Sequence, residues 1–89
     1  MNLNKSWELR IDKVVYKKLN RFPKKDFSEI IETIEFLPFN IYDGDIQKIK
    51  GEKNVWRRRV GNYRIFYEIY QKEKMINVFW VEQRGSKTY

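Results

Sequence analysis

The sequence contains no cysteine and no histidine, and both absences restrict the chemistry available to the protein. Without cysteine there are no disulfides and no thiolate metal ligands, which fits the reducing cytoplasm. Without histidine the protein lacks the most common general acid or base and the most common metal ligand. Any enzymatic activity must rely on lysine, arginine, tyrosine, aspartate or glutamate, and we expect neither a metal nor a cofactor.

Glycine and proline are also scarce, with four and two occurrences, each at a point where the sequence pattern changes. There is no linker, internal repeat or low-complexity segment. No apolar run approaches the ~20 residues that cross a bilayer, and residues 1–11 lack the apolar core of a signal peptide. The sequence therefore predicts one cytoplasmic domain over residues 1–89, without a membrane partner.

The chain is rich in aromatic and basic residues. Aromatic residues make up 17% and hydrophobic residues 42% of 89 residues, enough for one core. Nineteen lysines and arginines against twelve acidic residues give a net charge of +7. This charge favours polyanionic partners such as nucleic acid, an anionic membrane surface or an acidic protein. The positions of the basic residues must decide among them.

The first half of the sequence has the pattern of a short strand followed by two helices. Apolar and charged residues alternate over residues 7–12, as in an amphipathic strand. Apolar residues then recur at helical spacing over residues 11–22, and Pro23 ends this helix. A second apolar stripe over residues 27–37 predicts another helix, with acidic residues on its other side, and Pro38 ends it.

The second half of the sequence is predicted to be β structure. A loop at residues 38–46 comes first, with three apolar side chains expected to point inward: Phe39, Ile41 and Tyr42. The β-favouring segments are residues 55–60, 63–70 and 75–82. The resulting order, β-α-α-β-β-β, predicts an α+β fold with two helices packed on one face of a mostly antiparallel four-stranded sheet. The other face of the sheet is then free to carry function.

Three consecutive arginines, Arg57, Arg58 and Arg59, lie in one predicted strand. Because alternate strand residues point to opposite faces, Arg57 and Arg59 share one face and Arg58 points toward the helices. Arg64 in the next strand and Arg84 after the last strand can reach the face of Arg57. Four guanidiniums that keep their protons make a strong phosphate-binding surface.

The arginines and Tyr89 each allow a structural explanation as well as a functional one. Individual arginines can be solvent-exposed residues paired with Glu68 or Glu82, but four on one face favour an anionic ligand because gathered like charges cost stability.

Most aromatic residues of the strands are expected in the core. Tyr89 lies instead in a polar tail, where its ring could stack on an unpaired base, worth ~1–3 kcal/mol, or belong to a frayed end.

Residues 57–67, with the sequence Arg-Arg-Arg-Val-Gly-Asn-Tyr-Arg-Ile-Phe-Tyr, resemble a signature of RelE/ParE toxins. That signature is R-x-R-x-G-x-Y-R-h-x-Y, where h is apolar. Residues 48–51 resemble the basic-Leu-basic-Gly motif before it, and residues 78–89 resemble the last strand and the arginine–tyrosine tail of that family. The resemblance covers nearly the whole chain.

The resemblance implies a toxin of a toxin–antitoxin pair that enters the ribosomal A site and cuts mRNA. In RelE-type members the ribose 2′-hydroxyl attacks the adjacent phosphate without a metal. The catalytic residues implied by position are Arg57, Arg64, Arg84 and Tyr89. The implied RNA-binding residues are Lys48, Lys50, Lys53 and Arg59. The implied partners are a cognate antitoxin protein and the ribosome with mRNA in the A site.

The sequence departs from the family at the position of the general base. Two family lysines align with Val55 and Arg57, and an arginine is a poor base. Lys53 can substitute if the strand begins with a bulge. The alternatives are a ParE-like toxin that poisons DNA gyrase and an inactive RNA-binding relative. Arg84 with Tyr89 favours RNA cleavage, because ParE-type members generally lack this tail.

Overall fold

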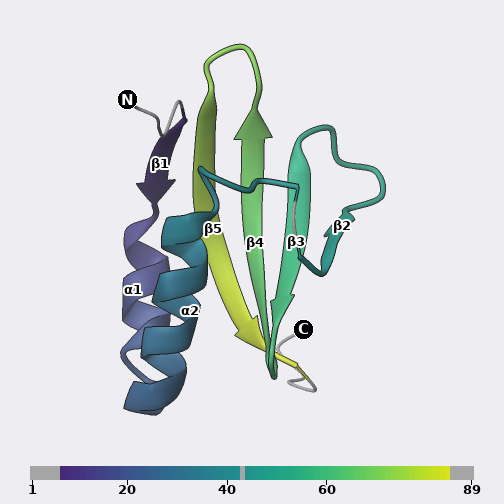
Figure 1. Ribbon diagram of the computed structural model, residues 1–89. Helices are drawn as coiled ribbons and strands as arrows, with labels where there is room; N and C mark the ends of the chain where they lie inside the picture. The colour runs from purple at the N-terminus through teal and green to yellow at the C-terminus, as the bar shows by residue number, and fades with distance from the viewer. Residues whose placement is uncertain (1–6, 43, 85–89) are drawn as a thin grey trace.

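The computed structural model describes residues 7–42 and 44–84. Within these residues the chain forms a five-stranded sheet in the order β1-β5-β4-β3-β2 and two helices (Figure 1). The elements are β1 (Glu8–Ile11), α1 (Lys13–Leu19), α2 (Lys24–Phe36), β2 (Ile46–Lys48), β3 (Val55–Val60), β4 (Tyr63–Tyr70) and β5 (Met75–Gln83). In this described part, β1 runs parallel to β5 and the other neighbouring strands are antiparallel.

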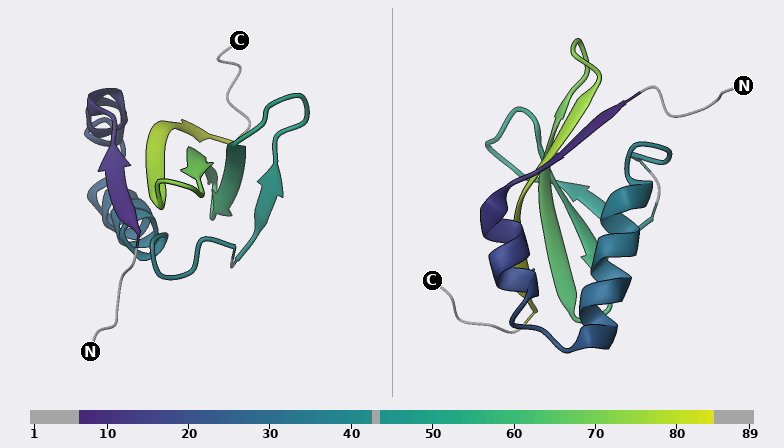
Figure 2. Two further views of the ribbon diagram at one scale, coloured as in Figure 1. Left: turned by 90° about the horizontal axis from the view of Figure 1, so that it is seen from above. Right: turned by 90° about the vertical axis from the view of Figure 1, so that its left-hand side faces the viewer.

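The core lies between the sheet and the helices. Alternation along β4 turns four buried side chains toward the helices: Tyr63, Ile65, Tyr67 and Ile69. The helices contribute four buried residues at helical spacing: Val15, Leu19, Ile30 and Ile34. Each such side chain stabilises the fold by about 1.5–3 kcal/mol. Both helices lie on the same side of the strands (Figure 2), so the opposite side, here called the open face, carries no helix.

The ends of α1 follow from local chemistry. The Asp12 carboxylate caps the helix by accepting a hydrogen bond from the Val14 N–H at 3.1 Å. The helix ends at Leu19, before the predicted end at Phe22. The chain must turn there to begin α2, and the Phe22 ring packs 4.6 Å from the Tyr63 ring instead of extending the helical stripe.

The prediction of four strands was wrong by one, because the structure has an additional strand, β2, directly after the predicted loop. This strand pairs antiparallel with β3, with Ile46 opposite Arg58 and Lys48 opposite Trp56. Three residues are too few to show a period of two, so the pairing with β3 rather than local sequence creates the strand. Gly44 precedes it with φ +86°, and a Cβ there would lie 2.5 Å from the Arg58 guanidinium carbon.

The prediction that the loop side chains point inward holds for Ile41 alone. Ile41 is buried, whereas Phe39 is 55% and Tyr42 50% exposed. These two rings pack on other aromatic residues at the surface. The Phe39 ring lies 6.3 Å from that of Phe36, and the Tyr42 ring lies 5.6 Å from that of Trp56, both nearly edge to face.

Tyr63 joins the start of β4 to the helices. Its hydroxyl donates a hydrogen bond to Asp26 Oδ2 at 2.5 Å. This bond, together with burial and the nearby negative charge, raises the pKa of Tyr63 from 10.0 to about 12. The fold therefore favours the neutral phenol. The resulting stability is fully present below pH 10 and is lost as the pH rises toward 12.

We predict that Tyr63→Phe lowers the free energy of unfolding by about 1–2 kcal/mol, because it removes a bond to a charged acceptor and keeps the ring. Urea denaturation at pH 7 measures the change. Tyr16→Phe alters an exposed tyrosine of α1 and should change stability by less than ~0.5 kcal/mol. The difference between wild type and Tyr63→Phe should shrink between pH 10 and 12. Equal stability at pH 7 contradicts the prediction.

Candidate functional site

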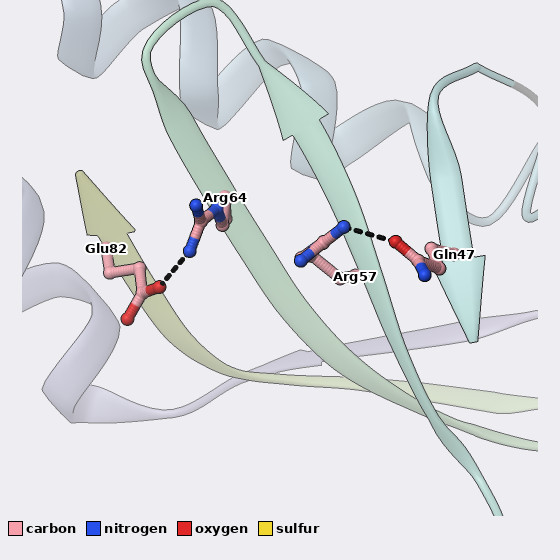
Figure 3. A network of polar contacts seen from close by, with 4 residues as sticks. All are labelled: Gln47, Arg57, Arg64 and Glu82. Carbon is pink, nitrogen blue, oxygen red and sulfur yellow. Dashed lines mark hydrogen bonds and ion pairs between the residues drawn. The ribbon is translucent and has the colours of Figure 1, made fainter. Parts of the chain in front are cut away.

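Three of the arginines predicted to bind RNA lie on the open face. The strand register pairs Arg59 with Arg64 and Arg57 with Phe66. Figure 3 shows Arg57 on β3 and Arg64 on β4 pointing to the same side of the sheet. Arg58 is paired with Ile65, which is buried under the helices, so it points the other way as strand alternation predicted.

Four charged residues form one row across the open face, here called the charged row: Asp45, Arg59, Arg64 and Glu82. Arg64 Nη1 lies 2.9 Å from Glu82 Oε2 (Figure 3), and Arg59 Nη1 lies 3.6 Å from Asp45 Oδ2. Glu82 is only 4% exposed, whereas Asp45 is exposed. The two central arginines repel one another, and the carboxylate at each end of the row balances them.

Glu82 reaches the open face because β5 contains an irregularity. Tyr67 pairs with Val78 but Phe66 pairs with Trp80, which leaves Phe79 as an extra residue in β5. Strict alternation from Val78 would turn Trp80 and Glu82 toward the helices. The extra residue reverses this phase, so that Val81 enters the core and Glu82 meets Arg64.

A second row runs parallel to the first and is here called the aromatic row: Gln47, Arg57, Phe66 and Trp80, with Phe79 beside Phe66. Arg57 Nη2 donates a hydrogen bond to Gln47 Oε1 (Figure 3), a neutral acceptor. Within residues 7–42 and 44–84 no carboxylate is paired with Arg57. Among the strand arginines of the open face, Arg57 is therefore the one whose charge is most available to an anion.

Arg84 and Tyr89 are the two predicted site residues of the C-terminal tail. Arg84 follows β5, and its N–H donates to the Asn62 carbonyl at 2.5 Å, which holds it beside the turn between β3 and β4. Its side chain is exposed and forms no hydrogen bond or ion pair with the described residues. Tyr89 lies outside the described residues, and its role stays a prediction.

The predicted RNA-binding lysines do not gather around the arginines. Lys48 is opposite Trp56 in the register, on the helix side of the sheet. Lys48 and Lys53 line a cavity of about 250 Å³ with Tyr42 and Trp56. Lys50 is exposed between β2 and β3. The register of β3 with β4 is regular from its first residue, so the bulge needed to bring Lys53 to the arginines is not there.

Two groups on the helix side do not take part in the open face. Arg58 lines a cavity of about 270 Å³ together with residues of α2 and the loop after it: Glu32, Thr33, Phe36 and Asn40. The Tyr67 hydroxyl is buried without a hydrogen-bond partner in the described chain, and burial raises its pKa to about 12. Tyr63 and Tyr67 are thus neutral at physiological pH and supply no base.

Sequence reasoning missed several neighbours of the arginines. Asp45 and Gln47 belong to the segment around β2, which carried no strand signal. The Nζ of Lys18 in α1 lies 4.2 Å from the centre of the Trp80 ring, a contact between distant parts of the sequence. Glu82 had a signal, since its position in the last strand had marked it as a possible arginine partner.

Within the described residues neither a metal site nor a membrane-spanning helix is found. Among residues 7–42 and 44–84 no group of three or more acidic residues is placed to hold a metal ion. Neither α1 nor α2 is long and apolar enough to cross a membrane. What the open face offers chemically is therefore fixed guanidinium donors, two carboxylates and aromatic rings.

Comparisons with known proteins place the chain among toxins of toxin–antitoxin systems. A family model for the ParE toxin of type II toxin–antitoxin systems, parDE, matches residues 9–86. The chain is 31% identical over 81 residues to RelE1 of Methanocaldococcus jannaschii, a protein named as a toxin. That match covers 88% of this chain and 90% of the relative.

Solved structures are similar over most of the chain. The archaeal RelE–RelB complex from Pyrococcus horikoshii OT3 matches with a TM-score of 0.78 and 27% identity, covering 90% of this chain and 97% of that one. The RelB–RelE complex from Methanococcus jannaschii matches with a TM-score of 0.69 and 31% identity, covering 83% and 88%. The isolated Escherichia coli RelE toxin shares the fold, with a TM-score of 0.74, 12% identity and coverage of 93% and 89%.

We predict that Glu82→Gln lowers the free energy of unfolding by about 1–3 kcal/mol, because Arg64 loses its charged partner in a nearly desolvated place. In the double variant with Arg64→Met the loss should be smaller than the sum of the single losses, by about 1–3 kcal/mol. Asp45→Asn, which alters the exposed pair, is the control and should cost less than ~1 kcal/mol. Additive losses in urea denaturation contradict the prediction.

Proposed function

The chain belongs to the RelE/ParE family of toxins of type II toxin–antitoxin systems, and from this membership we propose that it cuts mRNA in the ribosomal A site. The observation that supports the proposal most is Arg57. It stands on a sheet face without a helix, and within the described residues its hydrogen-bond partner is the neutral Gln47. Arg64 lies beside it on the next strand, and Arg84 follows β5 with an unpaired side chain in the described chain.

In the proposed reaction the ribose 2′-oxygen attacks the adjacent phosphorus, and the bond from phosphorus to the 5′-oxygen breaks. The products are a 2′,3′-cyclic phosphate and a free 5′-hydroxyl. The 2′-hydroxyl releases its proton to water and the leaving 5′-oxygen gains one, so the reaction produces no net change in protons. Negative charge grows on the phosphate oxygens in the transition state, so fixed guanidinium donors stabilise it more than the ground state. We assign this task to Arg57, Arg64 and Arg84.

The ion pair with Glu82 supports the assignment of Arg64. Arg64 donates through Nη1 to Glu82, and this contact fixes the guanidinium. A donor held in place before the reaction needs no reorganisation when charge develops. Tyr89 is proposed to stack on a base or to protonate the leaving oxygen.

The remaining basic residues are assigned to RNA binding rather than to the chemical step. Arg59 shares the open face but is paired with Asp45, so it fits a contact to the RNA backbone. Lys50 is exposed between β2 and β3, where it is free to contact RNA. Because Lys48 and Lys53 lie on the helix side, we assign them to ribosomal RNA, which would surround a protein in the A site.

We further propose a cognate antitoxin as the regulatory partner. The similar structures from Pyrococcus horikoshii and Methanococcus jannaschii are complexes of RelE with RelB. A net charge of +7 favours a partner segment rich in acidic residues with apolar anchors. The proposed site of action is the cytoplasm, where translating ribosomes are found.

We predict that brief induction produces codon-linked cuts in translated mRNA, detected by primer extension. DNA damage without mRNA cuts would indicate a gyrase poison, and absence of toxicity an inactive relative. On programmed ribosomes, Arg57→Ala and Arg84→Ala should each lower the single-turnover rate by about 10²–10³, with a smaller effect on ribosome affinity. Arg21→Ala, an exposed arginine outside the open face, should cleave at the wild-type rate.

The tail is tested in the same assay. Tyr89→Phe keeps a stacking ring and removes the hydroxyl, so a slow variant with unchanged affinity identifies the hydroxyl as acid or positioning group. A fully active variant leaves stacking as its contribution. Wild-type rates for both Arg57→Ala and Arg84→Ala would remove the basis of the catalytic assignment.

We also predict that co-expression of the adjacent open reading frame restores growth and yields a stable complex. The complex should weaken with rising salt, since an acidic segment on a basic surface gains much of its attraction from charge. Pull-down and growth assays measure both effects. A neighbour that neither binds nor rescues contradicts the antitoxin proposal and leaves the cleavage proposal to the primer-extension result.

A further inference from the structure

We propose that Phe66 and Phe79 form a stacking platform for unpaired bases of an RNA strand, with Arg57 and Lys18 as the phosphate contacts at its two ends. The inference rests on the proposed function and adds a subsite for the bases, which the cations of the open face do not provide. The occupant is single-stranded RNA, because an unpaired base can present its flat face to a protein ring.

The platform depends on the irregularity in β5. The rings of Phe66 and Phe79 have centroids 6.4 Å apart and planes inclined by 47°. Phe79 is the extra residue between Val78 and Trp80, so it has no register partner of its own in β4. An extra residue of this kind re-aims side chains, and here it brings two aromatic rings side by side on one face.

These rings are not part of the main core. The fully buried side chains of β4 and β5 lie on the helix side, among them Tyr67, Ile76 and Val78. Phe66 and Phe79 are half-buried on the face that no helix covers. Exposed apolar area costs about 25 cal/mol per Å² relative to burial. A bound base would remove this area from water, so burial of the rings would contribute favourably to the free energy of binding.

Cations flank the aromatic rings of this row on both sides. Arg57 lies directly opposite Phe66 on β3. At the other end, Lys18 Nζ lies 4.2 Å from the centre of the Trp80 ring, because α1 continues along β5 beyond the end of β1 (Figure 1). Two strand spacings separate Arg57 from Trp80, about 10 Å, with the rings between them. Cations on both sides of the rings are complementary to an RNA strand, in which phosphates alternate with bases.

A second pair of aromatic rings, more exposed than the first, lies on the helix side. Phe36 and Phe39 also place two rings near one another, 6.3 Å apart, and both are more than half exposed. Phe36 follows Glu35 in α2 and lines a cavity with both Glu32 and Arg58, so carboxylates stand close to this pair. Phe36 therefore offers a matched control of the same residue type away from the open face.

The test measures the affinity of the full-length protein for ribosomes programmed with an mRNA whose A-site codon is 2′-O-methylated and cannot be cut. One mRNA carries an intact codon and the other an abasic codon with the same phosphates. Wild type should bind the intact codon at least about tenfold more tightly. Phe66→Leu should lose this preference and match wild type on the abasic codon. Phe66→Tyr, which retains a ring, and Phe36→Leu should behave as wild type.

Equal affinity of the wild type for the intact and abasic codons overturns the inference, as does a Phe66→Leu variant with the full preference. Either result leaves the cleavage proposal standing, provided that wild type still cuts an unmodified codon. A wild type that neither binds nor cuts on programmed ribosomes overturns the proposed function and this inference with it. Circular dichroism melting checks each variant. If Phe66→Leu fails to fold, Phe79→Leu takes its place, because stacking by Tyr89 would also give the wild type a preference for the intact codon.

Discussion

Two arginines that face each other across the centre of the sheet set the main electrostatic constraint on this protein. Arg59 and Arg64 are direct register partners, and like charges in such a position destabilise a sheet. Glu82 on one side and Asp45 on the other neutralise this repulsion. The arrangement holds two guanidiniums in fixed places at little electrostatic cost. The two carboxylates thereby keep Arg59 and Arg64 close together in the absence of a ligand.

This balance divides the work among the cations of the open face. Arg64 is fixed by a buried carboxylate, whereas Arg57 is held by the neutral Gln47 and keeps its full charge for an anion. A site built in this way combines a strong local attraction with donors that do not move. The same face carries aromatic rings, so in the proposed complex phosphate and base would be recognised by adjacent rows of one sheet. The proposed cleavage of mRNA is the reaction in which such a face would be used.

Much of the fold and part of the site follow from simple periodicities. Period-two alternation predicted that Arg57 and Arg59 share a face and that Arg58 points to the helices, and the register confirms it. The same rule fails in β5, where one extra residue reverses the phase and sends Glu82 outward. The three residues of β2 are too few for any period to appear. The contact of Lys18 with Trp80 joins a helix to the last strand, which no local pattern encodes.

The parallel pairing of β1 with β5 has a consequence for the order in which the protein assembles. Glu8 lies opposite Met75, so within the described residues β1, which is synthesised first, gains its partner only after β5 has been made. Such distant pairing makes the closing step slow, because the loop entropy is lost before the contacts form. Glu82 belongs to that same last strand. The Glu82 carboxylate is therefore synthesised after both central arginines, and until β5 has been made a nascent chain has Asp45 alone to offset their repulsion.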